Sequence, residues 1–175
     1  MKKSRYFSEL FKNYLAEIDD LVMDSEGKLV LQKRLSDKRR EFAAILPMIE
    51  FSPEMVAVAF YGAFRFSSPE VMRSTVQCQP DDAEFLTWDD LRRELTVTDW
   101  ALPLIESSLK TPDGDAFLVA TAAVEFLRTN DTSDSSDSYD SASEDEDEGD
   151  DGDSNDLGEA GAEWLSEQGF EQLDR

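Results

Sequence analysis

Apolar side chains recur along the first 128 residues mainly at the spacing of a helix. Between positions 7 and 22 they follow an i, i+3, i+4, i+7 pattern, formed by Phe7, Leu10, Phe11, Tyr14, Leu15, Ile18, Leu21 and Val22. Gly27 supplies a stop signal. A second apolar face is formed by Leu31, Leu35, Phe42, Ile45 and Leu46. Pro47 is expected to end this second helix, because the residue before a proline disfavours the α-helical conformation. The pattern predicts two amphipathic helices.

Two similar start signals follow, in the stretches FSPEMV and FSSPEVM. Each places Ser as a cap, Pro at the first helical position and Glu one place later, which suits the positive end of a helix. The helix begun at Pro53 is apolar nearly all round up to Phe64, and we expect it to be the most buried one.

The last third of this region predicts further short helices. In TWDDLRREL, Thr87 and Asp90 have the spacing of a capping-box variant, and another helix is expected from about Pro103. TPDG predicts a turn, after which Asp115 is expected to cap AFLVATAAVEFLR. KLVLQ and ELTVT resemble short strands without supplying a full sheet. The fold class is therefore all-α, a compact bundle of about six helices over residues 1–129.

The charge is distributed unevenly along the chain. Residues 1–129 hold 16 of the 17 basic and 22 of the 40 acidic residues, whereas residues 131–156 contain 13 acidic residues and no basic ones. Such a segment has too few apolar side chains to offset the entropy of ordering, so residues 130–156 are predicted to be a disordered linker. Residues 157–175 resume with apolar groups and form a short C-terminal amphipathic motif that orders on a partner or on the bundle. Its apolar members are Leu157, Trp164, Leu165, Phe170 and Leu173.

Two residue types that are common in catalytic and metal sites are missing or rare. There is no histidine, which removes the commonest general base and metal ligand, and the lone Cys78 cannot build a zinc site. No glycine-rich phosphate loop occurs, and neither Gly149 nor Gly152 has the Glu six residues later that an EF-hand requires. Carboxylate pairs such as Asp89–Asp90 could in principle do acid–base work, but a charged helix surface is favoured. We therefore expect no enzymatic activity, no cofactor and no metal.

The sequence also bears on the compartment. A single cysteine allows no internal disulfide, which favours a reducing environment. Glu9 and Lys12 interrupt any signal-peptide run, and the longest apolar stretch, MVAVAFY, is far shorter than the ~20 residues of a membrane span. The expectation is an intracellular protein, cytoplasmic or nuclear or both, that is not secreted and has no membrane span.

The linker carries regularly spaced hydroxyl groups. Ser141 and Ser143 each have Glu three residues on, as acid-directed kinases prefer, and Thr132, Ser135, Ser138 and Ser141 follow one another at intervals of three. Each phosphate would complete the recognition site of the hydroxyl before it and add about −1.5 to −2 charge. One interpretation is a processive charge switch worked by an acidophilic kinase, and the other is a coincidence of composition.

The segment KRLSDKRR forms a dense basic patch, made of Lys33, Arg34, Lys38, Arg39 and Arg40. Three interpretations stay open: a solvated helix face, a docking site for the acidic tail, and an import signal or acidic-partner contact. Direct nucleic-acid binding is not expected, because the tail would compete with phosphates.

LAEIDDLVM, at 15–23, has the spacing of a leucine-rich export signal, but the same side chains form the best core stripe, and burial is favoured.

Four stretches, FSELFKNYLAE, SEGKLV, REFAAILP and GDAFLVATAAVEFLR, occur in an order similar to the helices of the small T antigens of adenoviruses. Members of that family are helical inhibitors of apoptosis. The resemblance spans about residues 6–128; residues 66–112 depart from it, and the Asn-Trp-Gly-Arg signature of the related cellular regulators is missing. It implies an apolar groove that captures an amphipathic helix of a pro-apoptotic protein. The surface around Val56, Phe60 and Phe64 is the candidate contact, although burial in the core is favoured for each of these residues singly.

Taken together, these patterns predict a non-enzymatic protein-interaction regulator. Its most specific form is a viral suppressor of host apoptosis that binds host regulatory proteins through their amphipathic helices. One alternative is an acidic decoy or chaperone for basic proteins such as histones. Another is a transcriptional adaptor acting through Trp164, Leu165, Phe170 and Leu173 of the C-terminal motif.

Overall fold

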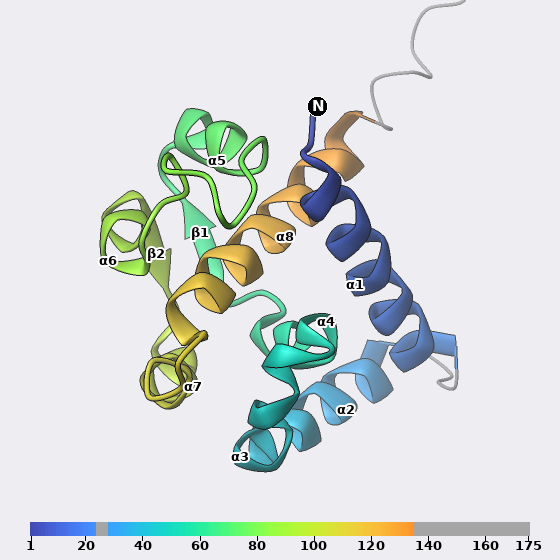
Figure 1. Cartoon of the computed structure of the whole chain (residues 1–175). Coiled ribbons are helices and arrows are strands. Elements are labelled where there is room, and N and C mark those ends of the chain that lie inside the picture. The colour runs from blue at the N-terminus through green and yellow to red at the C-terminus, as the bar shows by residue number, and fades with distance from the viewer. Residues whose placement is uncertain (24–27, 135–175) are drawn as a thin grey trace, which may run out of the picture. The chain divides into compact units, whose positions relative to one another are not determined.

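The computed structural model describes residues 1–23 and 28–134, all within one compact unit, Met1–Tyr139. This part of the chain is all-α, as predicted (Figure 1). Its α-helices are α1 (Arg5–Met23), α2 (Lys28–Arg40), α3 (Phe42–Ile45), α4 (Pro53–Ala57), α5 (Pro69–Thr75), α6 (Trp88–Leu91), α7 (Leu102–Ser108) and α8 (Gly114–Asp134). Four 3-10 segments connect them: η1 (Leu46–Glu50), η2 (Val58–Phe60), η3 (Arg92–Glu94) and η4 (Asp99–Ala101).

Two short strands complete the fold. β1 (Phe64–Phe66) pairs antiparallel with β2 (Leu95–Val97), so that Phe64 lies opposite Val97 and Phe66 opposite Leu95. The strand character of ELTVT is thus confirmed, whereas KLVLQ belongs to α2. The expected helix from Pro53 to Phe64 is wrong in its length. It stops at Ala57, continues as η2, and turns at Gly62, whose φ of +74° favours glycine.

Helix α8 occupies the centre of the core. It lies between α1 on one side and α5, α6 and the strand pair on the other (Figure 1). Residues 117–127 are eleven consecutive positions whose side chains are each no more than 4% exposed. The longest buried run therefore belongs to α8 and not to the segment after Pro53.

Helix α1 has fully buried side chains only in its first half. Its buried residues are Phe7, Leu10, Phe11 and Tyr14. Beyond them Ile18 and Leu21 are half-buried, while Leu15 is 37%, Val22 42% and Met23 83% exposed. The core stripe expected up to Val22 thus reaches full burial only as far as Tyr14.

The predicted helix caps were correct in part. Ser52 and Ser68 occupy the N-cap positions with Pro in the first turn, but neither hydroxyl caps its helix. Thr87 caps α6 as expected, accepting from the Asp90 N–H at 3.3 Å. Asp115 is not a cap, because α8 begins one residue earlier. Its carboxylate instead accepts from the Trp88 N–H at 3.1 Å and ties α6 to α8.

The junction of α7 and α8 requires glycine. A Cβ on Gly114 would lie 1.8 Å from the backbone oxygen of Ser108, far inside van der Waals contact. The Thr111 hydroxyl donates to the same oxygen at 2.7 Å. This close approach fixes the turn at residues 111–113, which forms one wall of the pocket described next.

Candidate protein-interaction site

An open pocket of about 340 Å³ lies between the α3–η1 segment and the turn before α8. One wall comes from α3 and η1 and the other from residues 111–113. The lining residues are Ala43, Leu46, Pro47, Ile49, Glu50, Thr111, Pro112 and Asp113. The concave surface is mostly apolar with a few polar groups at its edge, which is the usual composition of a binding site for an apolar group.

The first wall follows from the break at Pro47. Proline has no N–H to donate, and the α-helix ends at Ile45 before the chain continues as the tighter η1 turn. Ile49 is 8% exposed and anchors this turn to the core. This wall therefore presents side chains from the α-helix α3 and the 3-10 segment η1, and Ile49 holds it against the core.

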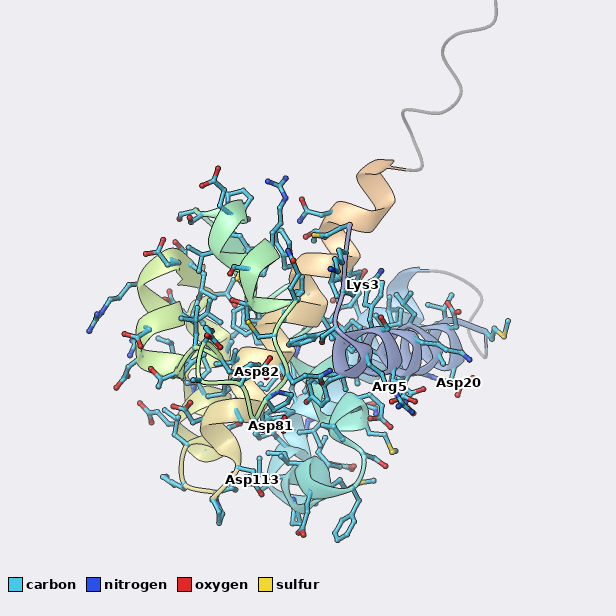
Figure 2. The ribbon with its side chains drawn as sticks, turned by 45° about the horizontal axis from the view of Figure 1, so that its top comes forward. Lys3, Arg5, Asp20, Asp81, Asp82 and Asp113 are labelled. Carbon is cyan, nitrogen blue, oxygen red and sulfur yellow. The ribbon has the colours of Figure 1, made fainter. Side chains whose placement is uncertain are left out.

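Exposed apolar side chains lie next to both walls in the chain. Phe51 directly follows η1 and is 80% exposed, and Leu109 precedes the second wall and is 44% exposed. Figure 2 labels Asp113, which lies in the turn before α8. Neither Phe51 nor Leu109 is among the residues that line the pocket.

The residues proposed from the resemblance lie elsewhere. Val56 and Phe60 are 0% exposed and Phe64 is 6% exposed. The rings of Phe60 and Phe64 stack with centroids 5.9 Å apart inside the core. As placed, these side chains offer a partner no surface. A sequence signal for the actual pocket was the helix break at Pro47 between two apolar residues, Leu46 and Ile49.

The basic patch does not form one free surface. Arg39 donates to the carbonyls of Ala59 at 2.9 Å and Tyr61 at 3.0 Å, and its guanidinium lies 3.8 Å from the centre of the Trp100 ring. Burial lowers the pKa of Arg39 below its ordinary value, and the charge of Glu125 opposes this. The cation therefore serves the fold by holding α2 on η2.

The other residues of the basic patch either lie on a solvated helix face or bind neighbouring segments of the fold. Lys38 donates to the Met55 carbonyl at 3.3 Å and pairs with Glu17 at 3.5 Å. Arg40 pairs with Asp37 in the solvent, Lys33 is exposed, and Arg34 is half-buried. Arg40 and Lys33 thus belong to a solvated helix face, whereas Lys38 and Arg39 bind the backbone of neighbouring segments.

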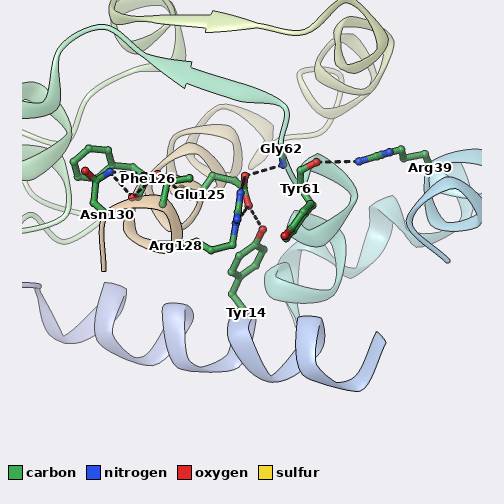
Figure 3. A network of polar contacts seen from close by, with 9 residues as sticks. Tyr14, Arg39, Tyr61, Gly62, Glu125, Phe126, Arg128 and Asn130 are labelled. Atoms are coloured by element: carbon green, nitrogen blue, oxygen red, sulfur yellow. Dashed lines mark hydrogen bonds and ion pairs between the residues drawn. The ribbon is translucent and has the colours of Figure 1, made fainter. Parts of the chain in front are cut away.

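A buried carboxylate joins three segments of the fold (Figure 3). Glu125, 1% exposed, accepts from the Tyr14 hydroxyl, from the Gly62 N–H at 2.8 Å, and from Arg128 through two bonds of 3.0 Å each. The guanidinium of Arg128 also lies 4.1 Å from the centre of the Tyr61 ring. Because four donors occupy the carboxylate oxygens, this cluster stabilises the fold and leaves little capacity for binding a substrate.

Protonation in this cluster follows from burial and charge. Burial, together with the neighbouring Glu125, raises the pKa of Tyr14 well above its ordinary value. Burial alone would lower the pKa of Arg128, but the hydrogen bonds and charge of Glu125 raise it overall. The network at neutral pH therefore contains a protonated tyrosine and a charged arginine.

Within residues 1–23 and 28–134, no group of three or more His, Cys, Asp or Glu side chains is placed to hold a metal ion. Among the same residues, no helix has the length and apolar character needed to cross a membrane.

The remaining predicted sites lie wholly or partly beyond this part of the chain. Thr132 is in α8, which runs to Asp134, five residues past the expected end of the bundle. The other linker hydroxyls and the C-terminal aromatic motif lie outside the described residues: Ser135, Ser138, Ser141, Ser143, Trp164, Leu165, Phe170 and Leu173.

Comparison with protein families, curated proteins and solved structures finds no match for this chain.

Proposed function

We propose that this protein is a non-enzymatic interaction regulator that captures an amphipathic helix of a partner in the pocket between α3–η1 and residues 111–113. The observation that carries the proposal is the mostly apolar pocket itself, about 340 Å³ in volume, with the exposed Phe51 and Leu109 next to its walls in the chain. An amphipathic helix presents anchors at i, i+3 or i+4 and i+7, and one of these anchors would enter the pocket.

The energetics fit a modest but specific contact. Burying one large aliphatic or aromatic side chain contributes about 1.5–3 kcal/mol, and further anchors on Phe51 and Leu109 add to it. Three such anchors contribute about 4.5–9 kcal/mol in total. The costs of association and of ordering the helix are subtracted from this total, so the expected affinity is weaker than micromolar, which corresponds to about −8 kcal/mol.

The resemblance to the adenoviral small T antigens supports a more specific form of the proposal. In that form the captured helix belongs to a host pro-apoptotic protein, and the protein acts inside the host cell, in the cytoplasm or the nucleus. Phosphorylation of Thr132, Ser135, Ser138, Ser141 and Ser143 by an acidophilic kinase would then adjust the charge of the tail.

A second function is favoured by the charge distribution. Residues 130–175 hold 18 of the 40 acidic residues and one of the 17 basic ones, a composition suited to a decoy for basic proteins such as histones. Salt separates the two functions. Binding through exposed charges weakens steeply as the Debye length falls from ~10 Å at 0.1 M to ~3 Å at 1 M, whereas an apolar pocket keeps its affinity.

The test uses the full chain and a panel of fluorescent amphipathic helices from pro-apoptotic proteins, with binding followed by anisotropy at moderate salt. Ala43→Phe fills the pocket from an exposed position on its wall and should weaken binding at least about tenfold, the loss of one buried anchor. Ala44→Phe is the matched control, since Ala44 is the exposed neighbour that does not line the pocket.

The two variants decide the proposal together. Loss of binding in Ala43→Phe with retention in Ala44→Phe supports capture in this pocket. Equal binding by both variants, or no binding of any helix to the unchanged protein, would contradict it.

A further inference from the structure

The charges at the pocket define the partner more closely. Glu50 comes from one wall and Asp113 from the other, and no Lys or Arg lines the pocket. Both residues are exposed, and among the described residues neither carboxylate has a salt bridge or side-chain hydrogen bond. The pocket thus places negative charge on both sides of an apolar centre.

We propose that the captured helix carries a Lys or Arg one turn away from the apolar side chain that enters the pocket. This inference rests on the proposed function and concerns the identity of its partner. Residues three or four apart lie on the same face of a helix, so a cation at that spacing reaches the pocket edge when the anchor is seated.

Electrostatics favour a cation at this position of the partner helix over a carboxylate or a neutral side chain. A carboxylate at the same position of the partner would face two like charges, which is destabilising and selects against that partner. A neutral side chain would leave both carboxylates in water without gain. A cation lying between them would be attracted to both walls at once.

The two carboxylates do not contribute equally. Asp113 directly precedes α8, a helix of 21 residues, and the positive end of the helix partly compensates its charge. Glu50 is the last residue of the 3-10 segment η1 and lies at the negative end of that segment. We therefore expect Glu50 to dominate recognition of the partner's cation.

The test compares three peptides with one apolar face that differ only one turn from the anchor, where they carry Lys, Gln or Glu. Binding to the full chain should follow the order Lys, Gln, Glu. Each exposed ion pair contributes about 0.2–1 kcal/mol, so the Lys peptide should bind about 1.4- to 5-fold tighter than the Gln peptide at low salt. The preference should disappear near 1 M salt.

The contribution of the acidic tail to peptide binding must be distinguished from that of the pocket, because a protein with a net charge of −23 attracts any basic peptide. Glu50→Lys should reverse the order of the peptides, whereas Glu106→Lys makes the same change in net charge on exposed α7 surface outside the pocket lining and should keep it. A preference for Lys that persists in Ala43→Phe belongs to the tail.

The outcomes distinguish this inference from the proposed function. Reversal by Glu50→Lys and not by Glu106→Lys supports it. Equal binding of the three peptides, each still blocked by Ala43→Phe, overturns the cation preference while capture in the pocket stands. Binding unaffected by Ala43→Phe overturns both.

Discussion

Helices α1 and α8 are the two longest in the described part of the chain, and their surroundings differ. Helix α8 is buried on all sides over residues 117–127, whereas α1 buries one face fully over its first half and only partly beyond it, through Ile18 and Leu21. A periodic apolar stripe therefore indicates that a helix contacts a core, but it does not show how far along the helix that contact extends. An apolar run was no better guide, because it pointed to the segment after Pro53, whereas the longest buried run lies in α8.

The difference between the two helices is tested most strongly at Glu125 of α8. Glu125→Ala leaves the Arg128 guanidinium and the Gly62 N–H without their acceptor, and we expect unfolding to require about 3–5 kcal/mol less free energy. Glu17→Ala removes the corresponding ion pair from α1, whose two side chains are 23% and 22% exposed, and should cost less than about 1 kcal/mol. Urea denaturation at pH 7 measures both. Equal losses would show that burial does not set the strength of these pairs.

The two halves of α1 should respond differently to truncation. Phe11→Ala opens a cavity in the core and should destabilise the protein by about 3–5 kcal/mol. Val22→Ala, at a position 42% exposed on the same helix, should change stability by less than about 1 kcal/mol. Thermal unfolding monitored by circular dichroism is sufficient. A large effect of Val22→Ala would place the end of α1 in a contact that forms in solution.

The junction between the two helices is tested by Tyr14→Phe, which should cost about 1.5–3 kcal/mol at pH 7 because a hydrogen bond to a charged acceptor is lost. The folded state raises the pKa of Tyr14, so its contribution is complete below pH 10.0, the ordinary value, and declines as pH rises from there towards the folded pKa. Denaturation between pH 9 and 11 should therefore show a shallower alkaline decline in Tyr14→Phe. Parallel curves for the two proteins would contradict this assignment.

The sequence was sufficient to predict the helical class and several local features. The Thr87 cap, the helix end before Pro47 and the strand character of ELTVT follow from rules that act within a few residues, and the structure confirms them. Asp115 was assigned wrongly because its partner, the Trp88 N–H, is 27 positions away. Local capping rules contain no information about such a contact.

The candidate site was harder to predict for the same reason. Val56, Phe60 and Phe64 are apolar residues near a helix start, and composition alone does not separate a core position from a groove position. The pocket instead needs two segments more than 60 positions apart, represented by Pro47 and Pro112. Similarly, KRLSDKRR has the composition of a basic surface, yet Arg39 is fixed by backbone carbonyls of η2 and the residue after it.

The contact between Tyr14 and Glu125, separated by 111 positions, has a consequence for biosynthesis. A ribosome adds about 5–20 residues per second, so α1 waits on the order of 5–20 s for the helix that completes its binding surface. During that interval Phe7, Leu10 and Phe11 lack the central helix against which they are buried. Nascent chains of this protein should therefore engage chaperones until α8 has left the exit tunnel.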